Sequence, residues 1–356
     1  MAIDHNLITP IMCKDDPLHT CDIVGGGDRW GFRVNQDTLI TNNTLSYVLA
    51  YRKELFTNRG IVVPADHDLS WDKRVPSLWT PDDRINTSTD IFGWWKFDEL
   101  NQTLSAGDSI VTVNDSGPSR DTDLTAAGGI LFNQDHFGGM GTADMTADDD
   151  VFSAPDSSNL DVNAQKLEMY CVFKTGSDYT STFSGVNDAR FFMSKVDSST
   201  YAPSLRWFIN RNDNRGALTY KQTLQRSTSG VNKKEGNNFS PGDGNSYMYG
   251  LHYDVSDNTV DFYIDGDSNG TPTGDLILDP DTDGVLYIGN TAAATQGIQS
   301  YLGELLIING AGSISPSAAE RQLIEGYLAH KWGLEGSLPS GHPYETDPPR
   351  RASVYT

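Results

Sequence analysis

Short apolar segments separated by turn residues are the feature that most constrains the fold of this chain. From about residue 91 onward each is the length of a strand and is bounded by Gly, Asn, Asp or Ser: IFGWWKFDE, GGILFN, KLEMYCVFKTG, RFFMSK, SLRWFINRN, SYMYGLHYDV, NTVDFYIDGD, GVLYIGN and YLGELLIING. Several alternate apolar and polar residues, as a strand with one buried face does. Roughly nine to twelve such strands predict an antiparallel sandwich, because closing two sheets over one another hides most strand edges.

The composition agrees with a β-rich globular chain. Hydrophobic residues make up 37% of the 356 residues, and aromatic residues make up 10%. The apolar share is below the globular norm because turn residues are abundant, while the aromatic residues supply bulk for a core. The length allows one large domain with an accessory region.

The charge is strongly acidic, with 48 Asp and Glu against 26 Lys and Arg and a net charge of −22. Such a surface argues against nucleic-acid binding, which needs a basic footprint, and against anionic membranes. Solubility is the plainest role of this charge, and recruitment of cations is the alternative. No segment approaches the ~20 apolar residues of a membrane span. The start, MAIDHNLITPIMCKDD, has neither a basic nor an apolar signal region, so we expect no secretion signal.

The cysteines do not form a disulfide framework, because there are only three: Cys13, Cys21 and Cys171. Cys13, His19 and Cys21 lack the C-x2-C pairing of zinc sites, so we expect no zinc. The chain therefore combines the cysteine usage of a reducing cytosol with the strand-rich composition of an extracellular protein. A virion component, made in the host cytoplasm and working outside, fits both.

Residues 1–76 differ from the rest of the chain. Apolar residues at helical spacing predict a helix that Asn43 or Thr44 caps and Gly60 ends. Its face is formed by Leu45, Val48, Leu49, Arg52, Leu55 and Phe56. We interpret residues 1–76 as a small mixed arm that docks on a partner; the alternative is an extension packed on the main domain.

A second helix is predicted near the end of the chain, in IEGYLAHKWGL. Ser315-Pro316 would begin the helix and Gly333 would end it. Its apolar stripe consists of Leu323, Ile324, Tyr327, Leu328 and Trp332. We expect the stripe to pack on the rim of the sandwich and LPSGHPY to follow as an irregular clasp, with His330 and His342 in structural roles.

The order of these segments resembles the laminin-G-like, concanavalin A-like lectin and glucanase domains. The resemblance covers about residues 77–344 and rests on GWWKFDE, VNDSGPSRDTDL, LEMYCVFKTG, LHYDVSDNTVDFYIDG, LYIGN and the closing ERQLIEGYLAHKWGL with LPSGHPY. The closing helix is most similar to those of phage structural proteins and marine bacterial surface proteins. The resemblance implies a jelly-roll sandwich of two curved antiparallel sheets, often glycan-binding or adhesive and frequently with calcium. We expect residues 345–356 to form a C-terminal tail after this domain.

Two turns, DGDSNG and DPDTDG, have the D-x-[DN]-x-[DN]-G spacing that can gather hard oxygen ligands for calcium. The candidate ligands are Asp265, Asp267, Asn269, Asp279, Asp281 and Asp283. The twelfth position is Leu276 or Asn290 rather than the usual Glu, and ordinary hairpin turns use the same residues. Asp148 to Asp150 form a further acidic candidate.

Catalysis is not expected. Glucanases with this fold carry an E-x-D-x-x-E strand motif, because glycoside hydrolysis needs two carboxylates at a fixed short distance. This chain has no such motif, and it has neither G-x-S-x-G nor H-E-x-x-H. Glu99 and Glu304 stand singly and are interpreted as solvated strand residues.

Sugar binding without catalysis would use aromatic side chains as stacking platforms. The candidates are Trp94, Trp95, Trp207 and Tyr249. Because successive strand residues face opposite sides, one of Trp94 and Trp95 is expected in the core and the other outward. An outward ring would stack on a sugar or on a neighbouring subunit; a core or interface role is the alternative.

Together these features predict a non-enzymatic virion structural protein of a tailed phage, either a capsid decoration or a head-fibre component. The arm would bind capsid or other virion proteins, and a symmetric homo-oligomer such as a trimer would suit this docking. The alternative is a carbohydrate-binding adhesin that binds host-surface glycans, either a tail-fibre receptor-binding module or a bacterial surface lectin.

Overall fold

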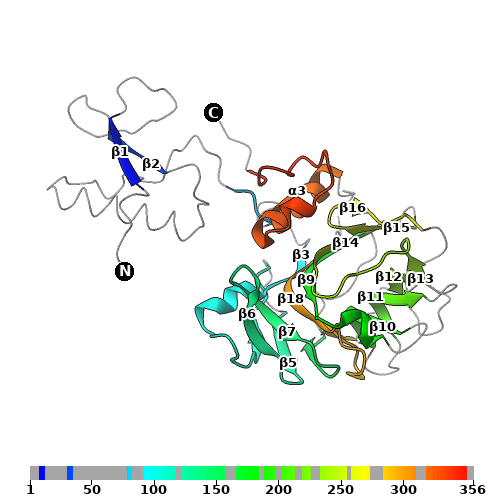
Figure 1. Cartoon of the computed structure of the whole chain (residues 1–356). Helices are drawn as coiled ribbons and strands as arrows, with labels where there is room; N and C mark the ends of the chain where they lie inside the picture. The colour runs from blue at the N-terminus through cyan, green and yellow to red at the C-terminus, as the bar shows by residue number, and fades with distance from the viewer. Residues whose placement is uncertain are drawn as a thin grey trace. The chain divides into compact units, whose positions relative to one another are not determined.

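The chain divides into two compact units, Met1–Ser77 with Arg351–Thr356 and Leu78–Arg350 (Figure 1). The computed structural model describes residues 8–12, 30–34, 78–81, 91–117, 122–156, 166–183, 188–197, 203–212, 219–225, 233–254, 258–272, 284–309 and 318–350. In the first unit, β1 (Ile8–Met12) pairs with β2 (Trp30–Val34) in an antiparallel ladder. The helix expected before Gly60 and the cysteine-rich segment from Cys13 to Cys21 lie outside the described residues.

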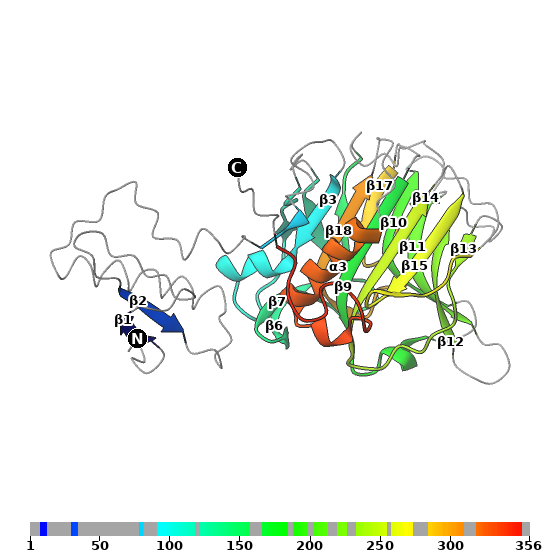
Figure 2. The ribbon, with the colours of Figure 1, turned by 90° about the horizontal axis from the view of Figure 1, so that it is seen from above.

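The second unit is a sandwich of two antiparallel sheets, which confirms the predicted fold class (Figure 2). One sheet, called here the helix-side sheet, has the order β16-β15-β14-β9-β18-β7-β6, with β3 also paired to β18. Its strands are β3 (Ile91–Lys96), β6 (Leu131–Phe137), β7 (Met140–Met145), β9 (Lys166–Thr175), β14 (Ser246–Asp254), β15 (Thr259–Ile264), β16 (Asp267–Ser268) and β18 (Ser300–Asn309).

The other sheet, called here the polar sheet, has the order β13-β12-β11-β10-β17-β8-β5-β4. Its strands are β4 (Thr112–Val113), β5 (Leu124–Ala127), β8 (Val151–Ala154), β10 (Ala189–Asp197), β11 (Pro203–Asn212), β12 (Thr219–Gln225), β13 (Lys233–Glu235) and β17 (Gly284–Ile288). The two sheets contain more strands than the sequence predicts, because strands of two to four residues are too short to show alternation. Three 3₁₀ turns complete the described unit: η2 (Phe97–Gln102), η4 (Tyr179–Thr182) and η5 (Glu335–Ser337).

The main core lies between the sheets and is rich in aromatic rings. Phe173 meets Tyr249 edge-to-face with ring centroids 4.8 Å apart, and Phe192 lies 4.8 Å from Trp207. Such pairs add to the hydrophobic effect of burial because ring edges and faces carry opposite partial charge. The core thus supports both sheets from their inner faces.

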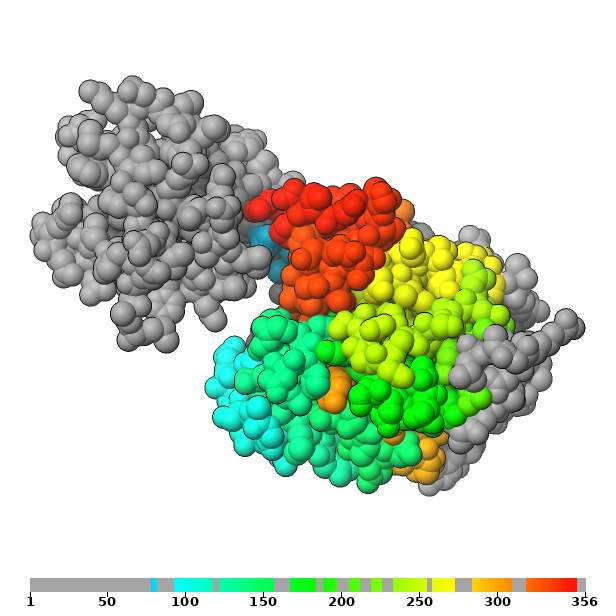
Figure 3. All heavy atoms as spheres, viewed as in Figure 1, coloured from blue at the N-terminus to red at the C-terminus, as the bar shows by residue number. Residues whose placement is uncertain are grey.

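Helix α3 (Ala318–Trp332) packs on the outer face of the helix-side sheet (Figures 1 and 3). Its buried side chains include Ile324, Leu328 and Trp332, as the stripe predicts. The expected position at the rim is wrong, since the helix lies on a cluster from four strands: Trp94, Tyr170, Val172, Met248, Leu306 and Ile308. It ends at Gly333, whose φ of +69° favours glycine. The predicted start at Ser315 lies outside the described ranges, and within those ranges no helix has the length and apolarity to cross a bilayer.

Candidate binding face

The four aromatic side chains proposed as sugar platforms are all buried, with at most 1% of each exposed. Trp95, Trp207 and Tyr249 belong to the core between the sheets. Trp94 does face outward from its sheet, as alternation requires, but α3 covers it. The expected arrangement, one ring in the core and the other outward, is confirmed, and both rings have the packing role that was the alternative to sugar stacking. None of the four rings offers a face to a sugar in this structure.

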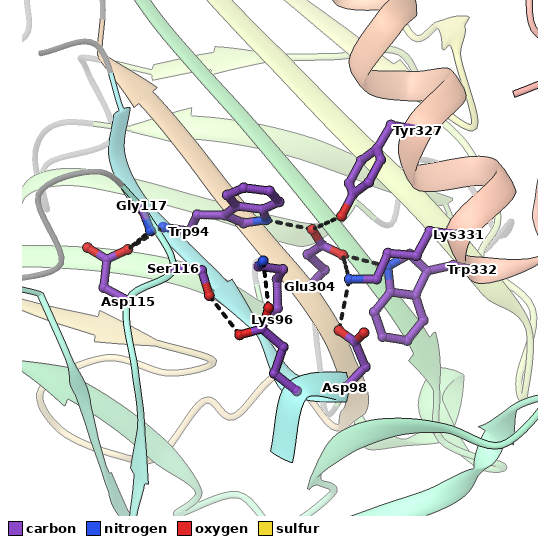
Figure 4. A network of polar contacts seen from close by, with 11 residues as sticks. Trp94, Lys96, Asp98, Asp115, Ser116, Gly117, Glu304, Tyr327, Lys331 and Trp332 are labelled. Atoms are coloured by element: carbon purple, nitrogen blue, oxygen red, sulfur yellow. Dashed lines mark hydrogen bonds and ion pairs between the residues drawn. The ribbon is translucent and has the colours of Figure 1, made fainter. Parts of the chain in front are cut away.

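Beneath α3, the carboxylate of Glu304 is a buried acceptor rather than a solvated strand residue, which corrects the expectation for this position (Figure 4). Its Oε1 accepts a hydrogen bond from Trp94 Nε1 at 2.6 Å and a longer one from the Tyr327 hydroxyl at 3.4 Å. Its Oε2 accepts from Trp332 Nε1 at 2.8 Å and from Lys331 Nζ at 2.7 Å. Four donors from one strand and one helix thus converge on a single carboxylate.

Lys331 extends this network to η2, because its Nζ also donates to Asp98 Oδ1 at 2.8 Å. Burial alone would lower the pKa of Lys331, but the carboxylates of Glu304 and Asp98 outweigh it and raise this pKa. Burial raises the pKa of Asp98, and the ammonium of Lys331 only partly opposes this. Glu99, by contrast, is half exposed in η2 and pairs with Lys96 at 2.6 Å. The buried acids therefore anchor the helix and present no open pair of carboxylates.

A second buried glutamate ties the helix to the segment that follows it. Glu325 accepts a hydrogen bond from Arg321 at 2.5 Å and lies 3.3 Å from Nε2 of His342. His330 Nε2 lies 2.8 Å from the carbonyl oxygen of Tyr344. These contacts agree with the structural roles expected for both histidines.

The first acidic turn uses its leading aspartate to hold the sheet. Asp265 has a φ of +51° between β15 and β16, and its Oδ1 accepts the backbone N–H of Met248 at 2.7 Å. Burial raises the pKa of Asp265 to about 6, against the bond from Met248. Asp267 is exposed, whereas Asn269 is buried and its Nδ2 has no hydrogen-bond partner. The carboxylate of Asp265 is thus already engaged with β14.

The second acidic turn, with Asp279, Asp281 and Asp283, lies outside the described residues. In the third acidic segment, Asp150 Oδ2 accepts the N–H of Ala147 at 3.0 Å, and Asp148 Oδ1 accepts from Gln299 at 2.6 Å. Across the described ranges, no three His, Cys, Asp or Glu side chains gather as metal ligands.

A continuous row of polar side chains crosses the outer face of the polar sheet. The registers of seven strand pairs place one such residue on every strand, from β4 to β13. This polar row consists of Thr112, Thr125, Ser153, Tyr287, Ser194, Arg206, Gln225 and Lys233. Their chain neighbours, such as Leu286, Leu205 and Leu224, point into the core, so the row faces away from it. Figure 2 labels β17, β10, β11, β12 and β13, which carry the row from Tyr287 to its end at Lys233.

Four buried polar atoms in the centre of this face have no hydrogen-bond partner: Ser194 Oγ, Arg206 Nε, Asn210 Oδ1 and Thr223 Oγ1. These four residues are called here the polar patch. Ser194 and Thr223 are fully buried and Asn210 is 8% exposed. A buried polar atom without a partner costs about 1–3 kcal/mol. The core also holds such atoms, including Trp207 Nε1 and Tyr249 OH, so the patch differs from them in lying on an outer face of the sandwich.

Apolar rings border the polar patch. Phe191 and Phe208 pair across β10 and β11 with ring centroids 4.8 Å apart, and with Ala189 they form a cluster separate from both cores. The guanidinium carbon of Arg206 lies 5.5 Å from the centroid of the Phe191 ring. Tyr287 in the polar row is half-buried. Polar donors beside aromatic rings are the combination that sugar sites use, because a sugar has both hydroxyl groups and apolar C–H faces.

Sequence reasoning missed this face, although the signal was present. In SLRWFINRN, the apolar residues Leu205, Trp207 and Ile209 alternate with Arg206, Phe208 and Asn210. Alternation assigns the first set to the core and the second to the outer face. The predicted platform Trp207 belongs to the core set instead.

No protein-family model and no curated protein matches the chain. Among solved structures, the chain is similar to domain 4 of the extracellular arabinanase AbnA from Geobacillus stearothermophilus, which was solved with arabinotriose. The two share 13% identity, the match covers 65% of this chain and 95% of the arabinanase domain, and the TM-score is 0.40. It is also similar to Trypanosoma rangeli sialidase, at 13% identity over 86% of this chain and 42% of that one (TM-score 0.41). The binding domain of Paraclostridial Mosquitocidal Protein 1 matches at 9% identity over 63% and 51% (TM-score 0.44). The chain thus spans less than two thirds of the sialidase and of the toxin binding domain.

Proposed function

We propose that the second unit is a non-catalytic carbohydrate-binding sandwich and that its ligand lies on the outer face of the polar sheet. The observation that carries this proposal is the polar row, whose members Ser153, Tyr287 and Arg206 are partly open to solvent beside four buried polar atoms without partners. Hydroxyl, amide and guanidinium groups of this kind can donate to and accept from the many hydroxyls of a sugar. Tyr287 supplies the half-buried ring against which a sugar face can stack.

The charges on this face support binding rather than hydrolysis. Within β10 to β13 the carboxylates are Asp197 and Glu235, and Glu235 is paired with Lys221 at 3.3 Å and Lys233 at 2.5 Å. Three strand spacings separate β10 from β13, about 14 Å. Glycosidases hold their two carboxylates about 5–9.5 Å apart. This pair is too far apart for that reaction.

The test begins with a glycan array probed with the full chain, followed by calorimetric titration of the best ligand. The key variant is the double substitution Ser194→Ala with Thr223→Val. Each change removes a hydroxyl that has no partner in the protein, so we expect an unchanged or slightly higher free energy of unfolding. We expect sugar affinity to fall about two- to tenfold for each hydroxyl that bonds the ligand.

Thr146→Val is the matched control, because its hydroxyl is exposed in the segment after β7 of the helix-side sheet and bonds Asp144 at 2.7 Å. Its affinity for the sugar should equal that of the parent chain. An array without any bound glycan would refute the proposal, as would a double variant that binds like the parent. A double variant that unfolds much more easily would show that the hydroxyls have structural partners.

The setting we propose is the surface of a tailed-phage virion, as a capsid decoration or head-fibre component made in the host cytoplasm, with residues 1–76 binding capsid or other virion proteins. Support comes from the acidic composition, the three cysteines and the resemblance of the closing helix. If residues 1–76 are the anchor, the full chain co-sediments with particles and a chain lacking them does not, while both still bind the glycan. If neither sediments, the adhesin alternative stands. Light scattering of the full chain tests the homo-oligomer.

A further inference from the structure

Basic residues are concentrated in one part of an acidic chain. The four strands β10 to β13 contain seven Lys or Arg and two Asp or Glu, although the whole chain has a net charge of −22. More than a quarter of the 26 basic residues therefore stand on adjacent strands of the polar sheet. These seven are Arg190, Lys195, Arg206, Arg211, Lys221, Lys233 and Lys234.

Four of the seven point toward the sandwich interior or its ends and have partners in the protein. Arg190 donates to the carbonyl oxygen of Ala189 at 3.0 Å, and Arg211 donates to that of Phe183 at 2.6 Å. Lys195 lies 3.7 Å from Asp156. Lys234 donates to the carbonyl oxygens of residues 258 and 272. These charges are used in holding the fold together.

The remaining three lie on the outer face, and only one of them lacks a carboxylate partner. Lys221 and Lys233 share Glu235. For Arg206, no hydrogen bond or ion pair occurs with any part of the chain that the structure describes, and its Nε is buried without a partner. Burial lowers the pKa of Arg206, and no carboxylate opposes this. In a chain with 48 acidic residues, a half-buried guanidinium without a counter-charge is a site suited to an external anion.

The neighbours of Arg206 are polar but buried, so the half-buried guanidinium is the most accessible group of the patch. Ser194 stands directly opposite it on β10, and Gln225 stands directly opposite on β12. Thr223 is diagonal to it and Asn210 lies four residues along the same strand. With strands about 4.8 Å apart and a rise of about 3.3 Å per residue, this patch measures about 10 by 13 Å, the size of one or two sugar rings.

We propose that this face selects acidic glycans, with the half-buried Arg206 receiving the carboxylate or sulfate group of an anionic sugar while the half-buried Tyr287 of the polar row contacts its neutral part. The proposal rests on the proposed glycan binding by the same face. A guanidinium presents donors in a planar fork that fits the oxygens of both anions, and such charge-assisted bonds are about twice as strong as neutral ones.

The test compares ligands that differ only in charge. Oligogalacturonides and their methyl esters have the same ring shape, and sulfated and desulfated galactan oligosaccharides form the second arm. The full chain and its Arg206→Met variant are titrated with all four. We expect the parent to prefer the acidic member of at least one pair by about ten- to hundredfold, as a charge-assisted bond implies. Arg206→Met should lose that preference but keep its affinity for the neutral member, while Arg206→Lys should retain part of it.

Lys174→Met is the matched control, because it removes the same charge from the outer face of the other sheet, where Lys174 is half-buried. It should keep the preference. Arg206→Met should unfold about as easily as the parent, since the guanidinium loses only its contact with the Phe191 ring, which a methionine side chain can also make. A parent without preference for acidic members would overturn the assignment to Arg206, as would a preference that survives in Arg206→Met. In either case the Ser194→Ala with Thr223→Val result still decides the proposed function on neutral sugars.

Discussion

Replacing Glu304 by glutamine should destabilise this protein severely, although the two side chains have nearly the same shape. Donors from Trp94, Tyr327, Lys331 and Trp332 converge on the carboxylate, which is fully buried. A carboxylate only accepts hydrogen bonds, whereas an amide brings two donors of its own. Glu304→Gln would therefore turn the amide nitrogen toward other donors and leave the ammonium of Lys331 without its closest counter-charge.

The magnitude follows from the burial of the group. Removing one partner of a buried ion pair costs about 3–5 kcal/mol, because the remaining charge is left uncompensated. Asp98 still lies 2.8 Å from Lys331 and holds part of that charge, so we expect a loss of about 3 kcal/mol for Glu304→Gln. Equilibrium denaturation in urea measures it, with tryptophan fluorescence reporting the two indoles that lose their acceptor.

Glu99→Gln is the control, because Glu99 is half exposed and its pair with Lys96 contributes at most about 1 kcal/mol. A double-mutant cycle with Lys331→Met isolates the coupling, which should exceed 1 kcal/mol for groups 2.7 Å apart. If Glu304→Gln matched the parent within about 0.5 kcal/mol, the four-donor arrangement would not be what holds α3 to the sheet.

Three further predictions concern turns and the closing helix. Gly326→Ala should gain about 1 kcal/mol of helix propensity but lower the free energy of unfolding by about 1–3 kcal/mol overall, because the new Cβ would lie 2.6 Å from Cβ of Tyr344. Thermal unfolding measures this loss. Gly336→Ala is the control and should show no such loss, because a Cβ at Gly336 would have no atom within 4 Å. Because burial raises the pKa of Asp265 from 3.8 to about 6, the stability it contributes is complete below pH about 4 and is lost as pH rises through 6. Asp265→Asn should therefore raise Tm at pH 8 and leave it nearly unchanged at pH 3.5. If the turn at 279–283 holds the expected calcium, millimolar calcium should raise Tm of the full chain and of Asp265→Asn alike, and a chelator should reverse the rise. An unchanged Tm would refute the calcium site expected from the sequence.

Alternation and helical spacing predicted much of this fold because they depend on local geometry. A two-residue period assigns Leu205, Trp207 and Ile209 to one face of β11, and the structure places all three in the core. The stripe of α3 and its end at Gly333 follow from spacing and from the backbone freedom of glycine in the same way. The buried face of a strand or helix can therefore be predicted without knowing which element packs against it.

The candidate site was not predictable by the same means, because it depends on which outer face is covered. Trp94 satisfies alternation and still is not exposed, since a helix more than 200 residues later in the chain packs over it. The polar row becomes visible only when strand order places Ser153, Tyr287 and Ser194 next to one another. These residues are far apart in the sequence, and no local pattern joins them.

The closing helix explains why the two outer faces differ. A sandwich has two outer faces, and α3 covers the one whose strands supply Trp94, Leu306 and the acceptor Glu304. On that face the buried carboxylates of Glu304 and Glu325 are bonded to groups of the helix and the segment after it, and that of Glu168 accepts from the Tyr170 hydroxyl. On the opposite face, the same register that aligns the polar row leaves four buried polar atoms without partners. An apolar helix would leave those atoms still unbonded, whereas a hydroxyl-rich ligand could satisfy them, so the outer face that we propose for the ligand is the one that the helix does not reach.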